Sequence, residues 1–356
     1  MRQVMKFAAA MSVAAVALAA CGSSTTPSPG SGGGAATTGS AGGGAGLKVG
    51  MAYDVGGPGD HSFNDAAQTG LKKATADLGV KGKEATAVNG EAESARQERL
   101  QQLVDAGYTS IVAVGFAYAK SVGTVAKANP DVKFGIVDDA SPDSTGPNID
   151  NITFAENEGS FLVGAAAALK STANHVGFVG GVDTDLIKKF QAGYLAGAKA
   201  VKPSIVIDVK YLTEPPDFSG FNSVDKGKAA ADGMYQSGAD VVYHAAGGSG
   251  GGVFTAAKAA GKYAIGVDGD QAAYPDLASV KDVIITSMLK KVDVGVFDFI
   301  KSVSDGSFKS GLHVYNLKSG GVDYSTTGGK IDDIKAKLDD FKTQIIDGKI
   351  VVPTKP

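Results

Sequence analysis

The sequence has little of several residues on which common functions depend. It has one cysteine and no tryptophan, aromatic residues make up 7% of it, and its four histidines are scattered without the spacing of a metal site. A single cysteine cannot form an intramolecular disulfide, so the fold must depend on its core. The formal net charge is −3 and no basic cluster stands out, which argues against nucleic-acid binding. Nothing in the sequence singles out a nucleophile or a general base, so catalysis is the weaker hypothesis.

The first twenty residues have the pattern of an export signal. Two basic residues precede an uncharged, largely apolar run at 7–20, which is too short to span a bilayer comfortably. The letters LAAC at 18–21 match a bacterial lipobox, in which small residues fit the signal peptidase and the thiol accepts a lipid. A chance match is a poor explanation, because Cys21 is the only cysteine. We expect a signal peptide over 1–20 and a lipid anchor on Cys21, at the extracytoplasmic face of the cell membrane.

The next segment has almost nothing to bury. Residues 22–46 are nearly all Gly, Ser, Thr, Ala and Pro, a composition typical of a flexible, solvated linker. We therefore expect 21–46 to be the lipidated cysteine and a tether. The two or three acyl chains of a lipoprotein would give a stable anchor.

From residue 47 onward, short apolar runs alternate with helical patterns. Runs of this kind, bounded by Gly, Pro or Asp, indicate parallel sheets with helical crossovers. Two successive sets predict two doubly wound α/β lobes, whose ligands sit at the carboxyl ends of the strands. The expected strands are 47–55, 84–88, 110–115, 132–137, 175–179, 205–211, 240–245, 263–267 and 283–288, and the expected helices are 64–78, 92–106, 118–128, 159–169, 186–201, 226–237, 252–260 and 291–304.

The loop after the first expected strand, GGPGDHSFND at 56–65, carries an unusual aromatic residue. Ser62 or Asn64 could cap the following helix. Phe63 could be a hydrophobic staple on its own helix, or a stacking platform for a planar ligand with Asn64 offering a donor and an acceptor beside it. Both interpretations of Phe63 remain open at this point.

Two further strand ends in the first half carry candidate groups. Phe116 follows the third strand, and Asp138 and Asp139 follow the fourth. Acids at such positions are commonly helix caps, but no helix pattern begins at once here. A buried carboxylate at this place could accept hydrogen bonds from the nitrogen atoms of a ring.

The second half repeats the arrangement. Phe218 and Phe221 lie in a loop between a strand and a helix, and a glycine run at 247–252 follows another strand. The run lacks the Gly-Lys-Ser/Thr ending of a phosphate loop, so it is interpreted as a backbone wall near a ligand or as a hinge.

Acids and a lysine follow the next two strands. Asp268, Asp270 and Lys290 together suit the hydroxyl groups of a sugar, because each makes charge-assisted hydrogen bonds. A lone lysine at the start of a helix is more often a surface residue, and this alternative stays open for Lys290.

Taken together, these segments resemble the BMP family, the "basic membrane protein" lipoproteins, which are similar to purine-nucleoside-binding receptors of ABC importers. The resemblance extends from 47 to about 324 and preserves the family's order of motifs. Its blocks are GDHSFNDAAQTG, GFAYAKSVGTVAKANPDVKFGIVDD, ENEGSFLVGAAAAL, GFVGGVDTDLIKKFQAGYLAGAKA, DVVYHAAGGSGGGVFTAAKAAGKYAIGVDGDQ and TSMLKKVDVGVFD.

The resemblance implies a type I periplasmic-binding-protein fold, in which two lobes are joined by three crossovers and the ligand lies between them. Lobe one would hold 47–151 and 286–312, and lobe two would hold 152–285 and 313–356. Lys290 would then lie beside a hinge and the cleft, which favours a ligand contact.

The resemblance also implies roles for aromatic and amide groups. Phe63 resembles the family's base-stacking phenylalanine and Asn64 its base-binding asparagine. Phe221 best matches the opposing aromatic residue, with Phe218 as a close rival, because this loop departs from the family's pattern. Phe116 is a further candidate for the ligand site.

Charged groups complete the implied site. Asp138 matches the acid that recognises the purine edge, and Asp268 and Lys290 match the groups that hold the ribose hydroxyls, with Asp270 less clearly placed. His61 stands where the family usually has Lys, and Tyr118 lies in a segment that usually contains Phe, so the choice of ligand stays open.

The expected function is a lipid-anchored receptor that binds a nucleoside, preferably a purine nucleoside, and delivers it to an ABC permease. No enzyme activity, cofactor, metal or nucleic acid is expected, and the protein is expected to be a monomer. The alternatives are a receptor for a sugar or another small polar solute, and a lipid-anchored nucleoside hydrolase. A transcription regulator is disfavoured by the signal peptide and by the lack of a helix-turn-helix segment.

Overall fold

The computed structural model describes residues 46–356. The expected signal peptide, the expected lipid anchor on Cys21 and nearly all of the expected tether lie outside the described residues. Within the described part, no helix combines the length and the apolar character needed to cross a bilayer.

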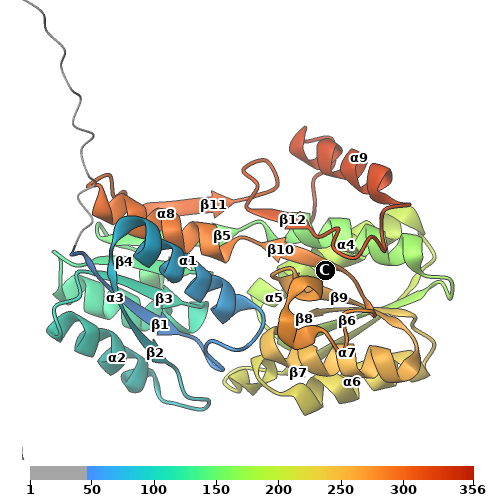
Figure 1. Ribbon diagram of the computed structural model, residues 1–356, viewed down its shortest axis with the longest axis horizontal. Coiled ribbons are helices and arrows are strands. Elements are labelled where there is room, and N and C mark those ends of the chain that lie inside the picture. The colour runs from blue at the N-terminus through green and yellow to red at the C-terminus, as the bar shows by residue number, and fades with distance from the viewer. Residues whose placement is uncertain (1–45) are drawn as a thin grey trace, which may run out of the picture. The chain divides into compact units, whose positions relative to one another are not determined.

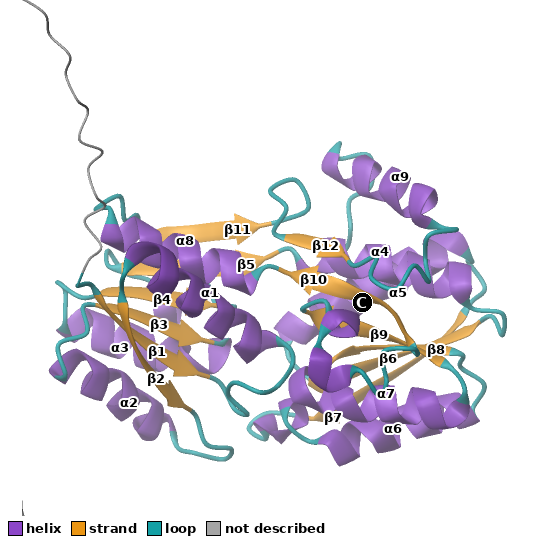
Figure 2. Cartoon of the chain, in the orientation of Figure 1, coloured by secondary structure: helices purple, strands orange, loops and turns teal. Residues whose placement is uncertain are grey.

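Two six-stranded sheets form the framework (Figures 1 and 2). The first is wholly parallel, in the order β11 (Gly311–Tyr315), β5 (Ile149–Phe154), β4 (Lys133–Val137), β3 (Ser110–Val114), β1 (Lys48–Tyr53) and β2 (Lys81–Thr86). The second has the order β12 (Val322–Tyr324), β10 (Ile284–Lys290), β9 (Tyr263–Asp268), β8 (Val241–Ala245), β6 (His175–Val182) and β7 (Val206–Thr213). Only β12 in this second sheet is antiparallel to its neighbour. The expected α/β fold with two parallel-sheet lobes is therefore confirmed.

Helices lie against both sheets, as the buried strands require. Around the first sheet are α1 (Phe63–Leu78), α2 (Glu93–Asp105), α3 (Ala119–Ala128) and α8 (Val292–Ser304). Around the second are α4 (Glu156–Lys170), α5 (Asp185–Val201), α6 (Val224–Gln236) and α7 (Gly250–Ala260), and α9 (Lys335–Ile346) packs on α4.

Helices α4 and α5 approach each other backbone to backbone, because glycines stand at their crossing. A Cβ atom at Gly193 would lie 2.1 Å from the carbonyl oxygen of Asn157, and one at Gly197 would lie 1.9 Å from that of Phe161. No side chain fits such distances. The abundance of glycine in this sequence thus has a packing function at this crossing.

The strand pairing shifts the expected lobe boundaries by a few residues. Strand β5 stays in the first sheet through Phe154, and β11 stays there through Tyr315, where it pairs with β5. Residues 286–290, expected in lobe one, belong to β10 and pair with β9 in the second sheet. The chain therefore crosses between the sheets near 155, near 291 and at 316–321.

Candidate functional site

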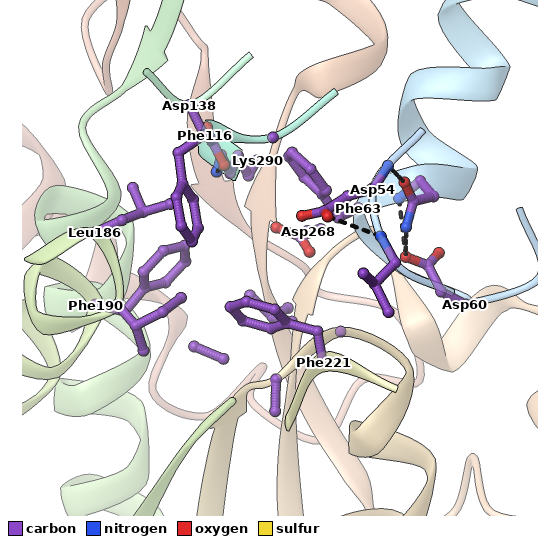
Figure 3. Close-up of a pocket in the computed structure, with 18 residues that line it drawn as sticks. Asp54, Asp60, Phe63, Phe116, Asp138, Leu186, Phe190, Phe221, Asp268 and Lys290 are labelled. Carbon is purple, nitrogen blue, oxygen red and sulfur yellow. Dashed lines mark hydrogen bonds and ion pairs between the residues drawn. The ribbon is translucent and has the colours of Figure 1, made fainter. Parts of the chain in front are cut away.

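A cavity lies between the carboxyl ends of the two sheets (Figure 3). Residues from both lobes line it, and two chemical classes among them define its character. The aromatic members are Phe63, Phe116, Phe190 and Phe221, and the charged members are Asp54, Asp60, Asp138, Asp268 and Lys290. The cavity therefore combines flat apolar surfaces with many hydrogen-bond acceptors and one cation.

The charged groups reach the cavity because strands end there. Asp54 and Asp138 directly follow β1 and β4, while Asp268 and Lys290 are the last residues of β9 and β10. Asp138 and Asp268 have φ angles of 68° and 63°, in the left-handed region that residues with a side chain seldom adopt. Such backbone conformations concentrate at functional sites, where the surrounding structure holds them in place.

Lys290 is buried and ion-paired, which excludes the alternative of a surface residue. Its Nζ lies 2.5 Å from Oδ2 of Asp138 and 3.3 Å from Oε1 of Glu156, and the residue is 2% exposed. Burial alone would lower the pKa of Lys290, but the carboxylates of Asp138, Glu156 and Asp268 outweigh burial and raise this pKa. Lys290 therefore stays charged at neutral pH.

Three phenyl rings complete the surroundings of this ammonium group. The Nζ atom lies 5.2, 5.1 and 5.4 Å from the ring centroids of Phe63, Phe154 and Phe190, respectively. A cation at this distance from a ring is attracted by its quadrupole. Rings and carboxylates together fix the ammonium group at the junction of the lobes.

Two carboxyl groups in the cavity have raised pKa values. Burial raises the pKa of Asp54 to about 6, against a hydrogen bond from the backbone N–H of Val55 that lowers it. Burial likewise raises the pKa of Asp268 to about 6, although the charge of Lys290 opposes the shift. Both groups are mainly ionised at neutral pH and accept hydrogen bonds.

Some acceptor capacity in the cavity is not used by the protein. Oδ1 of Asp138 is buried and has no hydrogen-bond partner among residues 46–356. Since a buried acceptor without a partner is costly, a ligand that donates to it would gain stability. Within the same residues, no group of acids, histidines or cysteines has an arrangement that could hold a metal ion.

Asp60 and Asn64 are largely occupied with the structure of their own loop. The carboxylate of Asp60 accepts hydrogen bonds from the backbone N–H groups of Ser62, Asn64 and Asp65, so Asp60 caps α1 in place of the expected Ser62 or Asn64. The side chain of Asn64 donates to Asp60 at 3.0 Å and accepts from the backbone N–H of Asp54 at 3.2 Å. Asn64 thus ties the loop together and keeps only part of its capacity for a ligand.

The aromatic side chains come from both sides of the cavity. Phe63, the first residue of α1, belongs to the first lobe, while Phe221 and Phe190 belong to the second (Figure 3). Phe116, two residues after the end of β3, lines the cavity as well. Phe63 therefore does more than staple its own helix.

Phe218 and Asp270, two of the expected ligand residues, lie outside the cavity lining. The ring of Phe218 packs edge-on against Phe116, with centroids 5.8 Å apart, and lies over the guanidinium of Arg96. Asp270 accepts hydrogen bonds from the hydroxyl groups of Ser325 and Thr327 within the second lobe. These partners account for both side chains without a ligand.

Several residues in or beside the site are not evident from the sequence. Asp54 follows a strand as Asp138 does, but it falls inside the strand expected at 47–55. Phe190 lies in the middle of α5, with no motif to mark it, and Glu156 is the first residue of α4, where acids are ordinary. Only the position of Asp54 carries a usable signal.

The glycine run after β8 is mostly a packing device. Gly247 does line the cavity, but a Cβ atom at Gly250 would lie 2.0 Å from the ring of His244, and one at Gly252 would lie 2.0 Å from the carbonyl oxygen of Val224. The expected backbone wall therefore involves only the start of the run.

Known proteins are similar to this chain in sequence and in fold. Residues 47–355 match the model of a family described as "ABC transporter substrate-binding protein PnrA-like". The chain is 38% identical to the CD4+ T-cell-stimulating antigen of Listeria monocytogenes over 86% of this chain and 88% of that protein. It is 37% identical to the ABC transporter nucleoside-binding protein BmpA of Lactococcus lactis, over 87% and 90% of the two chains.

A solved structure agrees with these matches. An ABC transporter solute-binding protein from Aeropyrum pernix superimposes with a TM-score of 0.75 at 29% identity, covering 86% of this chain and 94% of that one. The expected family is confirmed: the chain belongs to the PnrA-like family of ABC transporter substrate-binding proteins, and its role is binding, not catalysis.

Proposed function

We propose that this protein captures a nucleoside, preferably a purine nucleoside, between its two lobes and delivers it to the permease of an ABC importer. The observation that carries the proposal is the combination of phenyl rings from both lobes with carboxylates that retain free acceptor positions. A planar base fits between rings, and its N–H groups and the ribose hydroxyls are donors. A relative at 37% identity is named a nucleoside-binding protein, which supports the same class of ligand.

Phe63 and Phe221 would hold the base from opposite lobes. Each ring contributes about 1 kcal/mol of stacking beyond the burial of area. Because one ring belongs to each lobe, the base would bridge the lobes and favour their closure. Closure around the ligand would give the permease its signal.

The polar groups would divide between base and ribose. Asp138 and Lys290 are in direct contact at 2.5 Å, so they must meet the same part of the ligand. We assign this pair, with Asp268, to the ribose hydroxyls, and Asp54 with the remaining capacity of Asn64 to the base edge. The assignment moves Asp138 from the base edge, where the family resemblance placed it.

Charge in the cavity favours an uncharged ligand. Four carboxylates line it together with one lysine, and that lysine is already paired with Asp138 and Glu156. A phosphate group would meet repulsion from these acids and find no free cation among the lining residues. Nucleosides should therefore bind and nucleotides should not.

Calorimetry with guanosine, inosine, adenosine, uridine and guanosine monophosphate tests the proposal. We expect binding of the purine nucleosides and none of the monophosphate. A protein that binds a sugar but no nucleoside would contradict the proposal and support the solute-receptor alternative. In that case Phe63→Ala would leave binding unchanged, because a sugar does not require a stacking platform on both sides.

The lipid on Cys21 would hold this receptor beside its permease. Substrate-binding proteins of ABC importers act outside the cytoplasm, and a tether of residues 22–46 would keep the folded part near the membrane. We expect Cys21→Ala to move the protein from the membrane fraction to the soluble exported fraction. Light scattering of this variant is expected to give the mass of a monomer.

A further inference from the structure

One hydrogen bond joins the two lobes outside the cavity. Nε2 of Gln271, in the turn after β9, donates to the backbone carbonyl oxygen of His61 at 2.9 Å, and His61 lies in the loop before α1. Neither residue lines the cavity. The contact therefore acts on closure without touching the space for a ligand.

The orientation of the Gln271 amide follows from its partners. Its Oε1 accepts from the backbone N–H of Val267 at 2.8 Å, and that N–H can only donate. The amide nitrogen must then face His61, whose carbonyl can only accept. Gln271 is 1% exposed, so its side chain has little freedom to turn away.

His244 supports the same orientation of the Gln271 amide. Its Nε2 lies 3.1 Å from Oε1 of Gln271, so the proton of the ring must be on Nε2. Burial lowers the pKa of His244 to about 4, which keeps the ring neutral near pH 7. The Gln271 oxygen thus has two donors from its own lobe, and its nitrogen is left for the other lobe.

The next two residues along the chain, Ser62 and Phe63, connect the contact at His61 to the ligand cavity. Oγ of Ser62 donates to Oδ2 of Asp268 at 2.5 Å, also across the lobes, and Phe63 presents its ring to the cavity. His61 has a φ of 52°, in the left-handed region. The backbone before Phe63 is therefore held by the second lobe at two successive residues.

We propose that Gln271 is a positioning residue for ligand retention: by holding the carbonyl of His61, it fixes Phe63 over the bound ligand and keeps the lobes closed. The choice of probe rests on the proposed function, since a nucleoside is needed to measure retention. Because Gln271 acts only in the closed state, its loss must speed dissociation and leave association nearly unchanged.

Gln271→Glu is the sharpest variant, since it keeps the acceptor for Val267 and His244 and replaces the donor with a second acceptor. Gln271→Met removes the donor without adding charge, but it also removes the acceptor for Val267 and His244, so the Glu variant is needed beside it. The matched control is Asp270→Asn, one residue away, whose partners Ser325 and Thr327 lie in the same lobe. Dissociation of radiolabelled guanosine is followed after dilution into unlabelled guanosine, and association by rapid filtration.

We expect dissociation about 10-fold faster in both Gln271 variants and association within about twofold of the original protein. Asp270→Asn should change neither rate by more than about twofold. Unchanged dissociation in both Gln271 variants would overturn the proposal. An equal increase of the dissociation rate in Asp270→Asn would do the same, and so would a loss of affinity caused by slower association.

If the original protein does not retain guanosine, the nucleoside assignment fails while the positioning role is still testable. Small-angle X-ray scattering of the ligand-free chain then provides the measurement. We expect a larger radius of gyration in Gln271→Met than in the original protein and in Asp270→Asn. Equal radii in all three would overturn the role of Gln271.

Discussion

The two lobes present their ligand-facing groups in different ways. In the first lobe, the side chains of Asp60 and Asn64 form most of their hydrogen bonds within the loop between β1 and α1 and at the end of β1. In the second lobe, Phe221 and Phe190 offer apolar surface, and Lys290 offers charge at the end of a crossover strand. In the proposed function, the first lobe would thus provide a polar surface held by its own hydrogen bonds, and the second would provide the groups that complete the site when the lobes close.

The largest expected effect comes from removing the charge that links these two surfaces. Lys290→Met leaves the carboxylates of Asp138 and Glu156 buried without their cation, which costs about 3 kcal/mol in unfolding free energy. We expect guanosine affinity to fall by about 100-fold, measured by calorimetry, with chemical denaturation for stability. Lys291→Met, the next residue along the chain, is the control. An equal loss in both variants would show that the lysine pairing does not organise the site.

Aromatic residues of the second lobe give the next largest effect. Phe221→Ala removes one side of the proposed sandwich and is expected to weaken guanosine binding by about 10-fold. Phe218→Ala removes an edge contact with Phe116 outside the cavity, and its effect should be about threefold or less. Calorimetry on both variants compares them directly. A larger loss of affinity in Phe218→Ala would indicate that Phe218, and not Phe221, stacks on the base.

Acidification should change the stability of the protein and its affinity for the ligand in opposite directions. Burial raises the pKa of Asp54 and Asp268 to about 6, above the values of the unfolded chain, so between pH 4 and 6 the folded protein binds more protons than the unfolded one. Stability from these two groups therefore rises as the pH falls through 6, whereas affinity falls, because protonated acids accept fewer hydrogen bonds.

Thermal unfolding and calorimetry from pH 7.5 to 5 would follow both trends in the ligand-free and guanosine-bound protein. Asp54→Asn should reduce the dependence of stability on pH. Parallel trends in stability and affinity would contradict the assignment of these carboxylates as acceptors of the ligand.

The smallest effect is expected for Asp270, an acid of the second lobe that lies outside the cavity lining. Asp270→Asn keeps an acceptor for Ser325 or Thr327, so guanosine affinity should stay within about twofold. Calorimetry under the conditions used for Lys290→Met provides the comparison. A loss of affinity of tenfold or more would indicate that Asp270 contacts the ligand.

Strand ends are the most informative feature of the sequence. Ligands at the carboxyl ends of parallel strands are a property of the fold, and this rule marks Asp138 and Asp268 from the strand pattern alone. Lys290 could not be placed from its sequence neighbours, since its partners come from the end of β4, from α4 and from three separate rings. The family resemblance, not the local pattern, moved it to the cleft.

The strands that the sequence did not predict share a physical cause. Strand β5 contains polar residues at a crossover, β11 is an edge strand with exposed Leu312 and Val314, and β12 is only three residues long. None has the apolar run of a buried strand. The C-terminal helix α9 differs, because Leu338, Phe341 and Ile345 stand at helical spacing and pack in the core, so the sequence carried a usable signal there.

The backbone contact between α4 and α5 has a consequence for the evolution of this protein. Phe190 lies three residues before Gly193, and Gly193 meets the carbonyl oxygen of Asn157, next to Glu156. Any side chain at Gly193 would push the two helices apart and shift Phe190 relative to the buried carboxylate. A glycine outside the cavity lining thus helps to set the width of the cavity. A mutation of Gly193 during evolution would change ligand specificity while every residue that lines the cavity stays the same.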